Sequence, residues 1–138
     1  MKVTGKPFLV AGSPMGTTII TSVLHTLINV IDFGYDAQRA VHAPRFHHQW
    51  QPDSLWMEPE FSADVREKLG ELGHSFRDRA FMGAVQLIIY DPEQCYYWGG
   101  ADGRRASGAA GANIGEQQSE AMAERCRLAT GGNQSVVP

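Results

Sequence analysis

The stretch of this sequence best suited to chemistry is residues 12–18, GSPMGTT. Its glycines and proline predict a tight turn between an apolar strand at 7–11 and a helix that starts at Thr17. The first turn of a helix leaves backbone N–H groups unpaired, the helix dipole adds partial positive charge, and glycine lets a ligand come close. Such a turn can bind a phosphate, or the oxyanion formed when an amide or ester is attacked. It lacks the lysine of a Walker loop, and the local pattern alone favours an ordinary strand-to-helix connection.

The five histidines do not have the spacing of a metal site. His47 and His48 are adjacent, and neighbours in an extended segment point to opposite faces, so they are poorly placed to hold one ion together. His25, His42 and His74 offer no HExxH-like spacing. We therefore expect structural histidines that hydrogen-bond to nearby backbone, and no metal.

A second candidate cluster is Asp102 with Arg104 and Arg105, which suits an anion clamp or a catalytic carboxylate with a partner. Solvated loop charges are the commoner outcome for such a cluster. Thr17 and Thr18 place hydroxyl groups beside the 12–18 turn, where helix capping and first-turn polarity are the favoured roles.

The aromatic residues allow two interpretations, a platform that stacks a ligand or a set of half-buried sheet side chains. They are Trp50, Trp56, Tyr96, Tyr97 and Trp98. Cys95 lies in a predicted strand, which favours an inert buried thiol over a nucleophile.

Strands and helices must alternate to position these residues. Asp36 is expected to cap a short second helix that Pro44 stops, and Ser62 a third that ends at Gly73. Residues 55–57, 74–77, 84–90 and 95–98 have strand character, the last two as a hairpin around a turn at 91–94. The first helix is predicted to end near Gly34 in a left-handed conformation, and its apolar positions are Ile20, Val23, Leu24, Leu27, Ile28 and Ile31. This order predicts a layered α+β fold.

The composition bounds the class of protein. A chain of 138 residues suits one domain, and a net charge of -3 argues against a general nucleic-acid binder. The longest apolar stretch falls short of a membrane span, and the first residues lead into no apolar signal segment. Cys95 and Cys126 show no metal-ligand spacing. Residues 106–138 are rich in Gly, Ala, Ser and Gln and are expected to form a flexible tail.

Several stretches together resemble the gamma-glutamyltranspeptidase family, also called glutathione hydrolases. The resemblance starts with GSPMGTTII at 12–20, NVIDFG at 29–34 and APRFHHQW at 43–50, which is highly particular to the family. It continues in the family's order through 52–53, Glu58, Phe61-Ser62, 72–74, MGAVQ at 82–86 and GGADGR at 99–104. It runs from about Pro7 to Arg105, so we divide the chain into a family segment at 1–105 and the tail at 106–138.

The resemblance implies an N-terminal-nucleophile hydrolase with a four-layer αββα sandwich. A precursor cleaves itself into a large and a small subunit, and a new N-terminal threonine attacks the gamma-glutamyl amide of a substrate such as glutathione. The glutamyl group then passes to water, an amino acid or a peptide, without metal or organic cofactor. Two backbone N–H groups of the family's turn form the oxyanion hole, and they correspond to Met15 and Gly16. Met15 stands where the family has glycine.

The chain resembles only the C-terminal part of the small subunit. Thr4 does not have the context of the nucleophile, and the groups that hold the substrate's alpha-amino and alpha-carboxylate lie elsewhere in the family. We therefore expect this chain alone to be inactive, to need the remainder of the small subunit and a large subunit, and otherwise to self-associate through exposed apolar faces. The family usually works in the periplasm or outside the cell. A non-catalytic subunit or interaction module is the alternative, and a small anion or phosphopeptide binder is a third.

Overall fold

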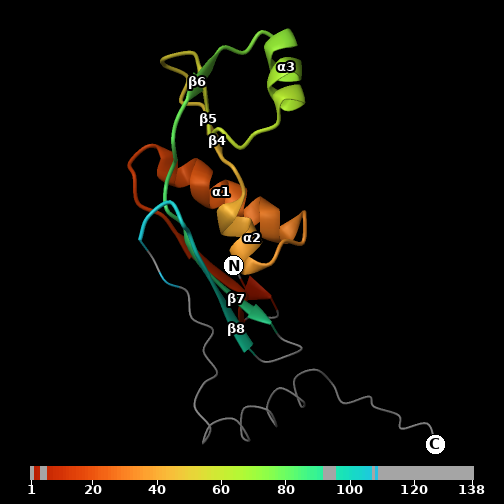
Figure 1. Ribbon diagram of the computed structural model, residues 1–138. Helices are drawn as coiled ribbons and strands as arrows, with labels where there is room; N and C mark the ends of the chain where they lie inside the picture. Colours follow the sequence, from red (N-terminus) through yellow and green to blue (C-terminus); the bar gives the residue numbers. More distant parts are fainter. Residues whose placement is uncertain (1, 4–5, 92–95, 107, 109–138) are drawn as a thin grey trace, which may run out of the picture.

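The computed structural model describes residues 2–3, 6–91, 96–106 and 108. Its larger sheet has three antiparallel strands in the order β3 (Leu9–Gly12), β7 (Gln86–Asp91) and β8 (Tyr96–Ala101). Two helices, α1 (Thr18–Ile31) and α2 (Ala37–His42), pack on this sheet (Figure 1). Two short strands, β1 (Lys2–Val3) and β2 (Lys6–Pro7), pair with each other ahead of β3.

The hydrophobic core lies between this sheet and the two helices. Side chains alternate between the two faces of a strand, and the core residues of the sheet are Leu9 and Leu87, next to Val85 just before β7. The helices contribute Val30, Ala37, Ala40 and Val41. An added Cβ at Gly100 of β8 would lie 2.4 Å from the carbonyl oxygen of Ala37, so glycine at this position lets α2 approach the sheet closely.

A second sheet lies at the other end of the molecule and is much smaller (Figure 1). Its order is β4 (Phe46–His47), β5 (Leu55–Met57) and β6 (Phe76–Asp78), with β4 antiparallel and β6 parallel to β5. A parallel pair needs a crossover connection, and α3 (Ala63–Glu71) supplies it. No residue of α3 is buried.

Helix α1 packs on the larger sheet mainly through a polar stripe and leaves most of its apolar positions exposed, in line with the exposed apolar faces expected for the chain alone. Its buried positions are Thr18, Ser22, Thr26 and Val30, a mostly polar i, i+4 stripe. The apolar face is open, and its exposed members are Ile19, Ile20, Leu24 and Ile31, with Ile20 77% exposed. Hydroxyl groups are tolerated inside because they bond to backbone carbonyls, as Thr26 Oγ1 does to Ser22 O at 2.9 Å. Within the described residues, this part of the apolar face is therefore left uncovered.

Most other expected elements are present. Asp36 caps α2 by accepting a hydrogen bond from Arg39 N at 2.8 Å, Gly34 and Gly73 have φ of 64° and 91°, and β7 pairs with β8 as a hairpin. Ser62 is the N-cap of α3, although its side chain makes no capping hydrogen bond. Strand β4 was not expected, because two residues are too short to show an alternating pattern.

Two expectations lie mainly outside the described residues. They are the turn at 91–94, of which only Asp91 is described, and the tail at 106–138, of which only 106 and 108 are described. Within the described part, no helix has the length and apolar character needed to cross a membrane.

Candidate functional site

The 12–18 turn joins β3 to α1 and has an unusual backbone. Met15 and Gly16 both have positive φ, 96° and 54°. Thr18 holds the turn closed, because Thr18 N and Thr18 Oγ1 donate to Met15 O at 3.3 Å and 2.9 Å. Thr17 is the N-cap of α1 and makes no side-chain capping bond, whereas Thr18 is buried. Thr18 therefore fills the polar first-turn role expected of it.

The N–H groups of Met15 and Gly16 are open to a ligand. Within the described part of the chain, neither group donates a hydrogen bond, and both residues are exposed. They stand at the N-terminal end of a helix of 14 residues, where the dipole favours negative charge. Two adjacent free donors at such an end can bind an anionic oxygen.

Met15 holds a conformation that favours glycine. A bulky residue at positive φ is strained, at a cost of about 1–3 kcal/mol. Its side chain is 37% exposed, so packing does not explain the strain.

The histidines serve structural roles. His47 is buried and His48 exposed, as their opposite faces predict. His47 Nδ1 lies 2.9 Å from Thr21 Oγ1, His42 Nε2 lies 2.8 Å from the Gln38 amide, and His48 Nδ1 accepts from Trp50 N at 3.2 Å. Two of these three partners are side chains instead of the expected backbone. Among the described residues, no three acidic, histidine or cysteine side chains converge to hold a metal ion.

Asp102 and Arg104 are not solvated loop charges, which corrects the expectation from sequence. Asp102 is 0% exposed and joins Arg45, Glu58 and Arg104 in one buried ion network. Arg45 Nη1 lies 2.7 Å from Asp102 Oδ2, and Arg104 Nε donates to Glu58 Oε1 at 2.8 Å. Arg105 is exposed outside it. Tertiary folding removes these charges from water because Arg104, which follows β8, reaches Val41 O in α2 and Glu58, which follows β5.

The network balances two arginines against two carboxylates. Burial and the charge of Arg104 lower the pKa of Arg45. Burial also acts to lower the pKa of Arg104, but its bonds to Glu58 and Asp102 outweigh that and raise it. Burial acts to raise the pKa of Asp102, yet the hydrogen bond from Arg104 N and the charge of Arg45 hold it below the ordinary value. The partners of Arg104 and Asp102 therefore favour the charged form of both groups near neutral pH.

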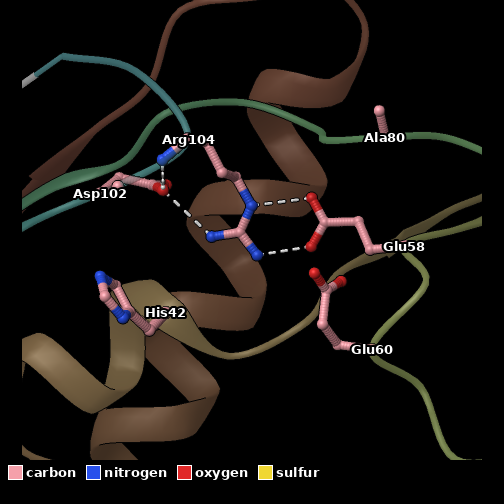
Figure 2. A pocket seen from close by; sticks show the side chains of 7 residues that line it. His42, Glu58, Glu60, Ala80, Asp102 and Arg104 are labelled. Carbon is pink, nitrogen blue, oxygen red and sulfur yellow. Dashed lines mark hydrogen bonds and ion pairs between the residues drawn. The ribbon is translucent and has the colours of Figure 1, made fainter.

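Sequence reasoning gave no role to Arg45 or Glu58. Arg45 follows a proline and Glu58 precedes one. Glu58 also directly follows the buried end of β5, and a charge at the end of a buried strand was the available signal. A cavity of about 300 Å³ borders the network. Figure 2 shows the Arg104 guanidinium held between Glu58 and Asp102. The charges beside this cavity already have partners within the network, which favours a structural role for the network over ligand binding.

The aromatic residues do not gather in one platform. Trp50 and Trp56 lie in or near the second sheet, whereas Tyr96, Tyr97 and Trp98 belong to β8. Trp56 is half-buried between His47 and Arg79, with ring centroids 5.3 Å apart in the first pair and the guanidinium 4.1 Å from the ring in the second. Cys95 and Cys126 lie outside the described residues.

Comparisons with known proteins agree on one family. The gamma-glutamyltranspeptidase family model matches residues 1–112. The chain is 44% identical over 100 residues to the glutathione hydrolase proenzyme of Escherichia coli K12, and 38% identical over 110 residues to that of Bacillus subtilis 168. These matches cover 72% and 79% of the chain, but only 17% and 19% of the two relatives.

Solved structures give the same result. The Helicobacter pylori gamma-glutamyltranspeptidase T380A mutant superposes with a TM-score of 0.73 and 40% identity, covering 76% of this chain and 58% of that one. An acivicin-inhibited gamma-glutamyltranspeptidase gives 0.73 and 39%, covering 78% and 58%. The expected α+β fold, part of an N-terminal-nucleophile hydrolase sandwich, is thereby confirmed. The chain belongs to the gamma-glutamyltranspeptidase family.

Proposed function

We propose that this chain is the C-terminal small-subunit segment, residues 1–105 with a tail at 106–138, of a gamma-glutamyltranspeptidase-like enzyme. The assembled enzyme cleaves gamma-glutamyl amides such as glutathione and transfers the glutamyl group to water, an amino acid or a peptide. The segment supplies the 12–18 turn, and the nucleophilic threonine comes from the rest of the small subunit. The partial coverage of the solved family chains supports this division.

The N–H groups of Met15 and Gly16 form the oxyanion hole in this proposal. The observation that carries it is their pair of free, exposed donors at the start of α1. Attack on an amide carbonyl places negative charge on its oxygen, and donors already fixed in place stabilise that charge without reorganising. The substrate carbonyl is held less strongly, so the donors lower the barrier more than they tighten binding.

The missing parts of the enzyme cover the open surfaces of the segment. The exposed apolar face of α1 and the apolar residues Val10 and Ile88 on the larger sheet, 61% and 48% exposed, support this part of the proposal. An amphipathic helix that buries its polar stripe has its large side chains available for a second layer. The partners are therefore the remainder of the small subunit and a large subunit, and self-association replaces them when the chain is alone.

The test is reconstitution. The chain is mixed with the remainder of a family small subunit and its large subunit, and release of product from a gamma-glutamyl anilide is measured. We expect turnover in the mixture and none from the chain alone. A stable complex without turnover would favour the alternative of a non-catalytic subunit, and product released by the chain alone would contradict the division.

The oxyanion role is tested in the same mixture. An amide-to-ester substitution at Gly16 N, made by semisynthesis, removes this N–H while leaving the positive φ of Gly16 accessible, and is expected to lower kcat about 100- to 1,000-fold with little change in KM. The same amide-to-ester substitution at Thr17 N is the matched control, because Thr17 directly follows Gly16 and its N–H has no part in the proposal. Equal losses in both variants would overturn the assignment.

A further inference from the structure

The 82–85 segment leads into β7, and its backbone forms hydrogen bonds mainly with side chains from other parts of the chain. It belongs to no helix or strand, yet Met82, Gly83, Ala84 and Val85 are all buried. Buried backbone groups need hydrogen-bond partners. Met82 N donates to Glu58 Oε1 at 2.7 Å, and Val85 N donates to Asp102 Oδ2 at 2.8 Å. The buried ion network therefore fixes both ends of this segment.

The same segment contacts the 12–18 turn on its other side. Ala84 N donates to Ser13 Oγ at 3.1 Å, and the same hydroxyl donates to Pro14 O at 3.0 Å. Ser13 thus joins the backbone of the turn to the backbone of the 82–85 segment, two residues before the Met15 N–H. Within the described residues, this is the one side-chain hydrogen bond between the two segments.

Gly83 sets the spacing of this contact. It has a φ of 69°, and an added Cβ would lie 2.6 Å from Ser22 Oγ and 2.7 Å from Ser13 Oγ. Those separations are far below van der Waals contact, so any side chain at Gly83 displaces both hydroxyl groups. The turn, α1 and the segment are therefore packed together at one point.

We propose that Ser13 is a positioning residue. It keeps the N–H groups of Met15 and Gly16 at a fixed position relative to the 82–85 segment, and therefore relative to the buried ion network. This inference rests on the proposed oxyanion role of the turn. Ser13 does not contact substrate. It donates to Pro14 O, which belongs to the same peptide as Met15 N, whereas Thr18 donates to Met15 O, in the same peptide as Gly16 N. A donor displaced by a fraction of an ångström stabilises the oxyanion less.

The first test follows the two amides by NMR in the ¹⁵N-labelled full chain. Ser13→Ala should move the Met15 and Gly16 signals and change their hydrogen exchange, whereas Ser13→Thr, which keeps the hydroxyl, should retain both. Ser75→Ala is the matched control, because it loses a comparable side-chain bond, Ser75 Oγ to Asp53 O at 2.8 Å, near the second sheet. Unmoved amide signals in Ser13→Ala would overturn the proposal, and so would loss of the whole fold.

The second test uses the reconstituted enzyme. Ser13→Ala should lower kcat about tenfold at unchanged KM, Ser13→Thr should restore it, and Ser75→Ala should have no effect. If Ser13→Ala moves the amides while kcat stays constant, the oxyanion role of the turn is wrong and the structural link stands. If loss of the Gly16 N–H by the ester substitution abolishes turnover while Ser13→Ala changes neither amides nor kcat, the oxyanion role stands and the role of Ser13 is overturned.

Discussion

Two arginine–aspartate pairs have the same length in two different regions. Arg45 and Asp102 are 2.7 Å apart beside the larger sheet, and Arg66 and Asp78 are 2.7 Å apart beside the second sheet. The Asp102 side chain is 0% exposed and that of Asp78 is 73% exposed. A surface pair is worth little because water and salt screen it. A buried carboxylate must keep its partners, since a lone buried charge is very costly. The N–O distance alone therefore does not reveal which ion pair contributes more to the stability of the fold.

The surroundings of the two pairs explain this difference. The larger sheet, α1 and α2 enclose the core cluster, and the 82–85 segment ties that core to the buried ion network. The second sheet has short strands, and α3 beside it buries no residue. Matched substitutions in the two regions can therefore show whether burial is the deciding factor.

The largest expected effect comes from removing the charge of each aspartate. Asp102→Asn leaves Arg45 buried beside a neutral amide and should lower the free energy of unfolding by about 3–5 kcal/mol. Asp78→Asn should lower it by less than about 1 kcal/mol. Urea unfolding of both variants measures the two values, and similar losses would show that burial does not separate the pairs.

Acid should reveal how much Asp102 contributes to stability. The folded-state pKa of Asp102 lies below its ordinary value of 3.8, so the unfolded chain takes up the proton first as pH falls. The stability that Asp102 contributes is complete above that value and is lost as pH falls through the folded-state pKa. Unfolding measured from pH 5 downward should show this loss in the native chain, and Asp102→Asn should flatten it.

The next largest difference in stability between the two regions should come from truncating a leucine side chain in each of them. Leu87 is 1% exposed and Leu72, at the end of α3, is 76% exposed. Leu87→Ala should destabilise by about 2–5 kcal/mol through lost burial and a new cavity. Leu72→Ala should stay within about 0.5 kcal/mol. Thermal unfolding of the pair provides the check, and a comparable loss from Leu72→Ala would mean that α3 is covered in solution.

Backbone strain should affect the two regions equally. Met15 and Trp50 are the non-glycine residues with positive φ in the described chain, at 96° and 70°. Met15→Gly and Trp50→Gly should each stabilise by about 1 kcal/mol, because strain relief is local and does not depend on burial. Thr17→Gly, at a φ of -62°, is the control that should not stabilise. A destabilised Met15→Gly would show that the Met15 side chain holds the turn.

The smallest expected effect concerns His25, which stacks on Phe46 with ring centroids 4.3 Å apart and so links α1 to β4. Burial and the charge of Arg45 lower the pKa of His25 below 6.5. Below pH 6.5 the unfolded chain therefore binds a proton more readily than the folded chain does, and stability declines as pH falls toward the folded-state pKa. Stability measured from pH 8 to pH 5 should show this decline, and an identical profile for His25→Gln would contradict it.

Local signals in the sequence determined much of this protein. The turn at 12–18, the cap at Asp36, the glycine ends at Gly34 and Gly73, and the β7–β8 hairpin follow from residues close together in the chain. The family also follows from the sequence, because its motifs are contiguous stretches. Each of these features depends on backbone preferences or short patterns that need no distant contact.

Only the tertiary structure decided which groups are buried. The α1 pattern shows which positions are apolar, but an amphipathic pattern does not say which neighbour covers which side, and in the structure the larger sheet meets the polar stripe. Asp102 looked like a loop charge until folding placed it beside Arg45, which is 57 positions earlier in the chain. Such long-range pairings depend on how the elements pack, and no local pattern in the chain encodes them.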